Sequence, residues 1–388
     1  MARFSLLTAF GTMLALTLVL GTAIGQGDKK KEDTVAGKTV TEWIKVLRED
    51  ESPKKRKIAL IALEASNSAG RVALGAVLES LEKDQEPEVR LHVVRLLGRL
   101  GKDVKPAFKV LLGAMQSDKS EAVREAAATV IGDKFLEQAK DYATVLGDAL
   151  KDPHAGTRIA VAGVLRNMGE DAQPAFPALF QAAKNPKETA LVRIAAIHVL
   201  SRHAKENTQT LPLLIDLAKN ADNPASLRET AIDGLGRSGR DSADLIAVLG
   251  AALADKNVEL RKASAIALGA MGVKAKDAWP AIKPRLSDEV EQEAAIRNHL
   301  IRLTGTLGKI HADAIPLLIT AAEKEKSTEN RIAAIQELGE LGTLAKEAAP
   351  TLEKLAAGDA RAAVREAATK ALKQIRPKKC ETLDEPDA

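Results

Sequence analysis

Cysteine is almost absent from this sequence: Cys380 is the only one in 388 residues, so no disulfide can form within a single chain. Aromatic residues make up only 2% of the chain although 45% of its residues are hydrophobic, which leaves Ala, Leu, Val and Ile to fill the core. Neither sign of charge dominates, because 57 basic and 53 acidic side chains leave a formal net charge of +4. We therefore expect no nucleic-acid partner.

Motifs that carry chemistry are also missing. The sequence has no Gly-x-Ser-x-Gly elbow, phosphate-binding loop or dinucleotide fingerprint, and Cys380 lies in a polar tail without a basic partner. No histidine stands three or four residues from another, as two ligands on one helix face would; the six are His92, His154, His198, His203, His299 and His311. We predict no catalytic residue, no metal site and no bound cofactor.

The N-terminus has the features of an export signal. Arg3 precedes an apolar run from Leu6 to Leu20, which is too short for a typical membrane span, and Ala23-Ile24-Gly25 offers small residues for a signal peptidase. We expect cleavage after Gly25 and a periplasmic or secreted protein. The alternative is a retained signal anchor, which would tether the chain to the membrane. Residues 26–39 are polar and are predicted to form a flexible linker.

A repeat of about 34 residues follows. An arginine recurs near the start of an alanine-rich helical segment at steps of 34, 34, 34, 35, 35, 33, 36, 34 and 34 residues. A second amphipathic segment precedes each of these segments, so every unit is predicted to be a helical hairpin. The recurring arginines are Arg56, Arg90, Arg124, Arg158, Arg193, Arg228, Arg261, Arg297, Arg331 and Arg365.

Several second helices end in Leu-Gly-x-Leu-Gly or a close variant, and the later glycine of each pair suits a left-handed C-cap. With Glu-Val-Arg at 88–90 and Ala-Val-Arg at 122–124 and 363–365, the chain resembles the HEAT-repeat family, including the HEAT-like units of phycobilisome lyases. The resemblance covers residues 40–376 and implies an all-α solenoid of about ten two-helix repeats. Tetratricopeptide repeats share the period but need recurrent aromatic residues that this chain lacks.

An acidic residue stands six positions before most of these arginines. Such a carboxylate can cap the second helix by accepting backbone N–H bonds, and the family resemblance implies a bond to the arginine of a neighbouring repeat. We interpret the set as a structural ladder that aligns repeats. Glu291 and Glu325 keep the charge in repeats 8 and 9, and Lys187 breaks the pattern in repeat 5. The ladder residues are Asp50, Arg56, Asp84, Arg90, Asp118, Arg124, Asp152, Arg158, Asp222, Arg228, Asp255, Arg261, Asp359 and Arg365.

Two other features have structural interpretations. Trp43 and Trp279 fall on apolar stripes of first helices and are predicted to be core residues. The basic run at residues 54–57 has no interleaved aromatics for base stacking and is predicted to be a solvated helix face.

A solenoid of this length presents a long concave surface, which the second helices are expected to line. The sequence favours an exported, non-catalytic scaffold or adaptor that binds a protein or peptide partner there. Two alternatives remain open: an enzyme of the lyase or metal-dependent hydroxylase type, and a membrane-tethered structural component of the cell envelope. Residues 377–388 are predicted to be a disordered tail.

Overall fold

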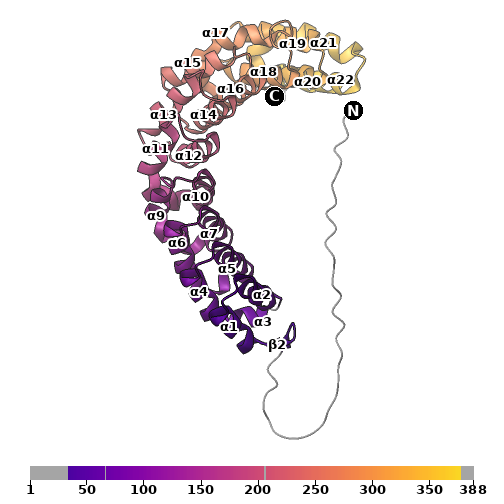
Figure 1. Ribbon diagram of the computed structural model, residues 1–388. Coiled ribbons are helices and arrows are strands. Elements are labelled where there is room, and N and C mark those ends of the chain that lie inside the picture. Colours follow the sequence, from indigo (N-terminus) through magenta and orange to yellow (C-terminus); the bar gives the residue numbers. More distant parts are fainter. Residues whose placement is uncertain (1–33, 66, 205–206, 377–388) are drawn as a thin grey trace, which may run out of the picture.

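The computed structural model describes residues 34–65, 67–204 and 207–376. The predicted signal peptide and its cleavage site, and the predicted tail with Cys380, lie outside the described residues. Helices stack side by side into a curved α-solenoid, with residues 40–64 at one end and residues 349–375 at the other (Figure 1). The predicted fold class is therefore confirmed. Within the described ranges, no helix combines the length and apolar character needed to cross a bilayer.

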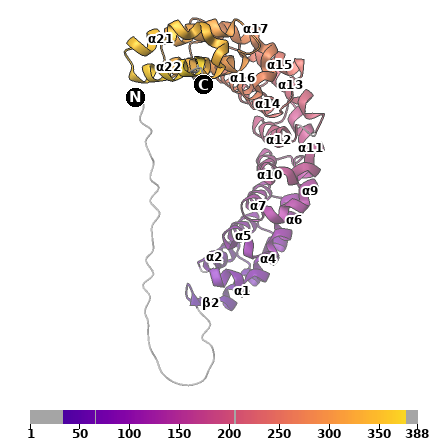
Figure 2. The same ribbon diagram turned by 180° about the vertical axis from the view of Figure 1, so that it is seen from behind.

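The outer layer of the arc holds the first helix of each pair (Figures 1 and 2). Several of these helices begin with a buried apolar residue, and three of those contain proline at the second position, where no N–H bond is lost. The first helices are α1 (Val40–Glu49), α4 (Leu74–Lys83), α6 (Ala107–Ser117), α9 (Ala143–Ala149), α11 (Phe176–Lys184), α13 (Thr210–Lys219), α15 (Ala243–Ala252), α17 (Trp279–Ile282), α19 (Ala314–Lys324) and α21 (Ala349–Gly358).

The inner layer holds the second helix of each pair, so the second helices line the concave surface as expected (Figure 1). All ten recurring arginines lie on them, one to each helix. The second helices are α2 (Pro53–Glu64), α5 (Pro87–Leu100), α7 (Glu121–Lys134), α10 (Ala155–Met168), α12 (Ala190–Arg202), α14 (Ala225–Arg237), α16 (Val258–Met271), α18 (Ala294–Leu307), α20 (Thr328–Leu341) and α22 (Ala362–Ile375).

Shorter helices connect the pairs. Five of them are 3-10 segments that lie between a second helix and the next first helix. The connecting elements are α3 (Asn67–Val72), η1 (Gly101–Asp103), α8 (Leu136–Ala139), η2 (Lys140–Tyr142), η3 (Gly169–Ala175), η4 (Gly272–Ala278) and η6 (Gly342–Ala348); η5 (Lys283–Leu286) extends α17.

The core runs along the array between the two layers. On α7, Val123, Ala127 and Ile131 are fully buried and form one face of the helix. Trp43 and Trp279 are each 6% exposed and are core residues, as expected. Because each buried face meets only its neighbours, stability is distributed along the array rather than concentrated in one centre.

The glycines after the second helices have two different roles. Gly272 and Gly342 adopt φ of +56° and +57°, the left-handed conformation predicted for a C-cap. Gly308 differs, because its φ is −62° and the chain there stays in the right-handed helical region. A side chain at Gly308 would approach the Leu341 Cδ1 atom to 2.8 Å, so this glycine allows close packing of α18 against the next repeat.

The predicted linker is partly structured. Strands β1 (Thr34–Val35) and β2 (Lys38–Thr39) form an antiparallel hairpin, so assigning all of residues 26–39 to a flexible linker was wrong at its C-terminal end. The Trp43 Nε1 atom donates to the Val35 carbonyl oxygen at 2.7 Å and ties the hairpin to α1. Thr39 then begins α1 with a capping box to Glu42.

Candidate functional site: the concave surface and its ladder

Most of the recurring arginines bridge two repeats beneath the concave surface. The Arg90 Nη1 atom donates to the carbonyl oxygen of Asp84 in its own repeat, while Nε and Nη2 donate to the Asp118 carboxylate of the next repeat, both at 2.7 Å. The same two-oxygen pairing recurs along the chain. The matching pairs are Arg56 with Asp84, Arg124 with Asp152, Arg158 with Glu188, Arg261 with Glu291, and Arg297 with Glu325.

The remaining ladder residues have fewer bonds. Arg228 reaches Asp255, and Arg331 reaches Asp359, through Nη2 alone. At the ends of the array, Asp50 lies 3.2 Å from the Lys55 Nζ atom, and Arg365 donates to the Asp359 carbonyl oxygen.

Burial and charge oppose each other in this ladder. Burial alone would raise the pKa of the Asp152 carboxyl, but hydrogen bonds from Arg124 and from the His154 backbone outweigh it and lower that pKa. The hydrogen bond to Asp152 in turn raises the pKa of Arg124. These pairs therefore stay ionised, and their paired oxygens and nitrogens fix the register between adjacent repeats.

The acidic residues also order the turn before most second helices, but not at the donors expected for an N-cap. The Asp84 Oδ1 atom accepts the backbone N–H of Glu86, and Asp118 accepts that of Ser120, in each case the residue two positions later. Glu86 and Ser120 are themselves the N-cap residues of α5 and α7. The carboxylate therefore closes an Asx-type turn in front of the helix instead of capping its first N–H groups.

Repeats 5 and 6 depart from the pattern because the residue that closes the turn stands four positions, rather than two, before the N-cap of the second helix. In repeat 5, Asn185 closes the turn and Thr189 is the N-cap, whereas in repeat 2 Asp84 precedes the N-cap Glu86 by two residues; the turn of repeat 6 is like that of repeat 5. Glu188, one residue after the expected position, takes the ladder place at 2.8 Å from Arg158, so Lys187 does not break the ladder. Repeat 6 has Asn223 at the position that corresponds to Glu188, immediately before the N-cap of its second helix.

Of the recurring arginines that have a following repeat, Arg193 is the one that no carboxylate of that repeat reaches among the described residues. It is only 5% exposed, its Nε atom donates to the Ala183 carbonyl oxygen at 3.0 Å, and burial lowers its pKa. Asp222 was assigned to the ladder from its spacing. It is exposed at the surface and is not the partner of Arg193, so that assignment was wrong. Asn223 is buried instead, and its amide donates to the Leu217 carbonyl oxygen.

Substituting Asn223 by glutamate should restore the ladder at this junction. Asn223→Glu is expected to raise the free energy of unfolding by about 1 kcal/mol, because a carboxylate would neutralise a buried guanidinium. Denaturant unfolding of the variant and the wild type measures the difference. The gain should vanish when Arg193 is also replaced by methionine; a gain that persists in that background would contradict the pairing.

The basic run at the start of α2 is largely neutralised by neighbouring acids. Arg56 pairs with Asp84, the Lys57 Nζ atom lies 2.7 Å from Glu88, and Lys55 contacts Asp50. The predicted interpretation as a helix face rather than an anion site fits these contacts.

A groove opens on the concave surface where α12, α14 and α16 lie side by side. It has a volume of about 460 Å³, and its walls combine apolar and acidic side chains. Ile266 is 42% exposed, and Leu191, on the same inner layer one turn before Ile194, is 61% exposed. We call this feature the concave groove; its lining residues are Ile194, His198, Ser226, Glu229, Thr230, Asp233, Glu259, Lys262, Ala263 and Ile266.

The charges of the concave groove are mainly negative. The carboxylates are those of Glu229, Asp233 and Glu259. Asp233 forms an ion pair with Arg237 on the same helix, and the Lys262 Nζ atom lies 4.0 Å from Glu259. Burial, with help from the nearby Arg237 and Arg166 charges, lowers the pKa of His198, so this imidazole is neutral at pH 7. The groove thus offers two isoleucines beside carboxylates, which complements an apolar and cationic surface.

Side chains suited to a metal do not gather here. Across the described ranges, no three His, Cys, Asp or Glu side chains come close enough together to hold an ion.

Sequence reasoning missed the concave groove, because its members come from three repeats and share no motif. A signal was present, however. Leu191 stands two residues before the recurring arginine of its repeat, and the adjacent repeats carry Gly156 and Ser226 at that position. Ile266 stands five residues after the recurring arginine of its repeat, and the adjacent repeats carry Asp233 and Arg302 there. Apolar residues at positions that are otherwise small or polar on an exposed face indicate an interaction surface.

A curved two-layer array with a continuous inner surface places the protein in the class of α-solenoids. A family model described as HEAT repeats matches residues 40–132, 108–201, 143–226, 211–298 and 282–373, which together cover most of the sequence. The chain therefore belongs to the HEAT-repeat family. A comparison with curated proteins finds no match.

Among solved structures, the likeness is to nuclear transport receptors. A structure on how Kap95p binding changes RanGDP is similar with a TM-score of 0.57 and 15% identity, over 87% of this chain and 49% of that one. Importin beta gives a TM-score of 0.55 and 13% identity, over 86% of this chain and 50% of that one. The chain thus spans about half the length of these proteins. At such identity the likeness concerns the fold.

Proposed function

We propose that this protein is a non-catalytic scaffold that binds a segment of a partner protein along its concave surface, with the concave groove as the main contact. The observation that carries the proposal is the combination of the exposed Ile266, the half-buried Ile194 and three carboxylates across α12, α14 and α16. Kap95p, a solenoid of similar fold, binds another protein, RanGDP. We take the likeness to phycobilisome-lyase units to be one of repeat architecture rather than of activity.

The chemistry of the groove favours an amphipathic, cationic partner segment. Lysine or arginine side chains would pair with Glu229, Asp233 and Glu259, while apolar side chains would cover Ile194 and Ile266. A helix of about 18 residues is about 27 Å long and would cross about three inner helices at a spacing of about 9 Å. Such a segment fits the width of the groove from α12 to α16.

Two synthetic helical peptides test this proposal directly. A peptide patterned with leucine and lysine is expected to bind the purified protein, whereas its twin with glutamate in place of lysine should not. The double variant Glu229→Lys with Glu259→Lys should weaken binding at least about tenfold, measured by calorimetry, because attraction becomes repulsion. Glu347→Lys, an exposed outer-layer change, is the matched control. Equal binding by both peptides, or unchanged affinity in the double variant, would contradict the proposal.

The partner itself can be identified by crosslinking in the producing cell. A photoreactive residue at Thr230 in the groove should capture a protein that the same residue at Thr320, exposed on α19 in the outer layer, does not capture. Capture at both positions alike would indicate nonspecific contact and count against a groove partner.

We further propose that the scaffold works outside the cytoplasm, because the N-terminal 25 residues have the pattern of a signal peptide. The mass of the protein purified from its own cell should correspond to a chain beginning at Gln26. An intact N-terminus on a cytoplasmic protein would refute this part of the proposal and leave the binding function untouched.

A further inference from the structure

A cavity of about 690 Å³ opens at one edge of the solenoid, where repeats 4 and 5 meet. One wall is the turn between α9 and α10, and the other is α11 with the turn that follows it; α9 and α11 are neighbours in the outer layer (Figure 1). We call it the edge cavity, and its lining residues lie within 150–158 and 178–188. None of them lines the concave groove.

The acidic residues of the edge cavity are already neutralised by the ladder. Both carboxylate oxygens of Asp152 accept from Arg124, at 2.6 and 2.9 Å, and both oxygens of Glu188 accept from Arg158, at 2.8 and 2.9 Å. The Arg158 Nη1 atom is also occupied, because it donates to the carbonyl oxygens of Asp152 and Pro153. The ladder residues therefore add no net charge to the cavity.

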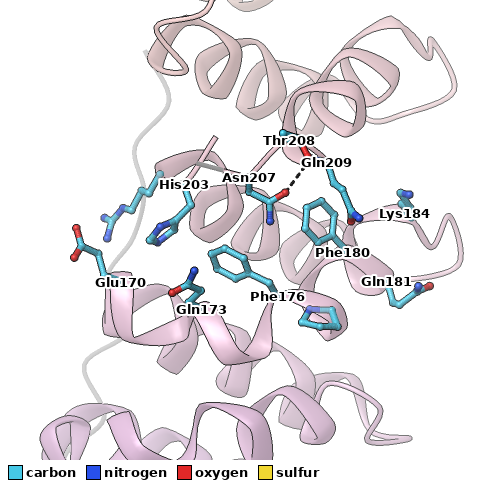
Figure 3. A pocket seen from close by; sticks show the side chains of 12 residues that line it. Glu170, Gln173, Phe176, Phe180, Gln181, Lys184, His203, Asn207, Thr208 and Gln209 are labelled. Carbon is cyan, nitrogen blue, oxygen red and sulfur yellow. Dashed lines mark hydrogen bonds between the residues drawn. The ribbon is translucent and has the colours of Figure 1, made fainter. Parts of the chain in front are cut away.

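The lysines of the edge cavity have no such partners. Among the described residues, the ammonium groups of Lys184 and Lys187 form no ion pair, and that of Lys151 meets only an exposed carboxylate, at 3.0 Å. An exposed pair of this kind is weak. Figure 3 shows Gln181 and Lys184 projecting from α11 on the side away from His203. The cavity thus has an excess of positive charge, with the Gln181 amide as a further donor.

Repeat 5 gains this charge because its turn departs from the repeat. Lys187 stands six positions before the recurring arginine, where repeats 2, 3 and 4 have aspartate, while Glu188 keeps the ladder place one residue later. The backbone N–H of Lys187 donates to the Asn185 Oδ1 atom at 3.0 Å, which fixes the backbone of Lys187 within the turn. The ladder therefore retains its acid, and a lysine is added beside it.

A corresponding cavity between repeats 2 and 3 differs in its charge. Its volume is about 760 Å³, and it too is lined by three lysines, Lys83, Lys109 and Lys119. Glu82, which forms no ion pair among the described residues, opposes them there, whereas Leu150 stands at this place two repeats later. The edge cavity therefore has the same number of lysines without the opposing carboxylate.

From this arrangement we infer that the edge cavity binds a phosphate monoester, a ligand unrelated to the partner segment of the concave groove. Such a group carries close to two negative charges at neutral pH and has three acceptor oxygens. Lysines bind phosphate as point charges, whereas a planar carboxylate is held best by an arginine fork, and the Arg158 fork is occupied by Glu188. Lys184 and Lys187 pair with the phosphate oxygens, and the Gln181 amide donates to the same group. The volume lies in the range of ordinary ligand sites.

Two phosphate monoesters and one carboxylate test this inference by NMR on the full protein with isotope-labelled lysine. Glycerol 3-phosphate and N-acetyl-O-phosphoserine amide are expected to shift the backbone signals of Lys151, Lys184 and Lys187 saturably, with a dissociation constant of about 1 mM or lower for at least one of them. The tighter ligand shows whether the phosphate comes from a small molecule or from a phosphorylated side chain. The amide of N-acetylaspartic acid, with a single negative charge, should bind at least about tenfold more weakly. No saturable shift with either phosphate, or equal binding of the carboxylate, would overturn the inference.

Two double variants provide the matched control. Lys184→Gln with Lys187→Gln should weaken binding of the tighter phosphate at least about tenfold, with the Lys151 signal as the reporter. Lys109→Gln with Lys119→Gln removes the same charge from the cavity between repeats 2 and 3 and should change the affinity less than about twofold. All four lysines are exposed, so both variants are expected to fold, which circular dichroism verifies. Equal weakening by the two variants, or unchanged affinity in the first, would refute the site; the wild-type titration decides independently of both.

Discussion

Replacing Arg297 with alanine is expected to lower the free energy of unfolding by about 3 to 5 kcal/mol. Arg297 is 3% exposed, and its Nε and Nη2 atoms donate to the Glu325 carboxylate at 2.5 and 3.0 Å. Its Nη1 atom donates to the Glu291 carbonyl oxygen at 2.6 Å. Removing the guanidinium leaves a buried carboxylate and a carbonyl group without their donors, and that desolvation cost makes the effect large.

An exposed pair provides the matched control for Arg297. Arg48 and Glu79 also join neighbouring repeats, at 3.0 Å, but their side chains are 50% and 39% exposed. Arg48→Ala should therefore cost less than about 1 kcal/mol in the same denaturant experiment. Replacing both Arg297 and Glu325 by methionine and leucine should recover most of the loss, because no unpaired charge remains. Equal costs for Arg297→Ala and Arg48→Ala would show that the ladder does not depend on burial.

The difference between predictable and unpredictable parts of this fold has a physical basis. The helical hairpins followed from the sequence because the arginine and the buried face recur in every unit, and each unit repeats the same local contacts. Glu188 could not be placed from spacing, since a turn two residues longer moves the ladder position by one residue. The hairpin at 34–39 depends on Trp43 reaching the Val35 carbonyl, a contact that no local pattern reveals.

The concave groove escapes sequence reasoning for a related reason. Ile194, Glu229 and Ile266 belong to three different helices, and only the stacking of α12, α14 and α16 brings them to one face. In a repeat protein the recurring residues specify the architecture, and the residues that depart from the repeat form the sites.

Glu337 is the other residue whose removal should have a large effect, and that effect depends on pH. Glu337 lies on α20 and is 9% exposed. It packs closely over Gly305 of α18, because a Cβ atom added at Gly305 would lie only 2.1 Å from the Glu337 Oε2 atom. Burial, and then the charge of Glu340, raise the pKa of Glu337 to about 7, although Arg302 opposes them at 3.8 Å. The folded protein therefore holds a proton here that the unfolded chain releases near the ordinary value of 4.5.

A carboxyl whose pKa is raised on folding stabilises the fold while it is protonated, and this contribution is lost as the pH rises through its folded pKa. The change from 4.5 to about 7 corresponds to about 3 kcal/mol, lost between about pH 4 and about pH 8. Glu337→Gln keeps the shape without the charge. The variant should match the wild type near pH 4 and exceed its unfolding free energy by about 2 to 3 kcal/mol near pH 8.

Denaturant unfolding at several pH values measures the difference between the two proteins. Glu329→Gln, an exposed change on the same helix, controls for the general loss of a negative charge and should follow the wild-type profile. Parallel profiles for Glu337→Gln and the wild type would mean that Glu337 is solvated when charged and that α18 and α20 separate enough to admit water. A diverging profile would instead mean that the packing of Gly305 against Glu337 holds these two inner helices together more tightly at acidic pH.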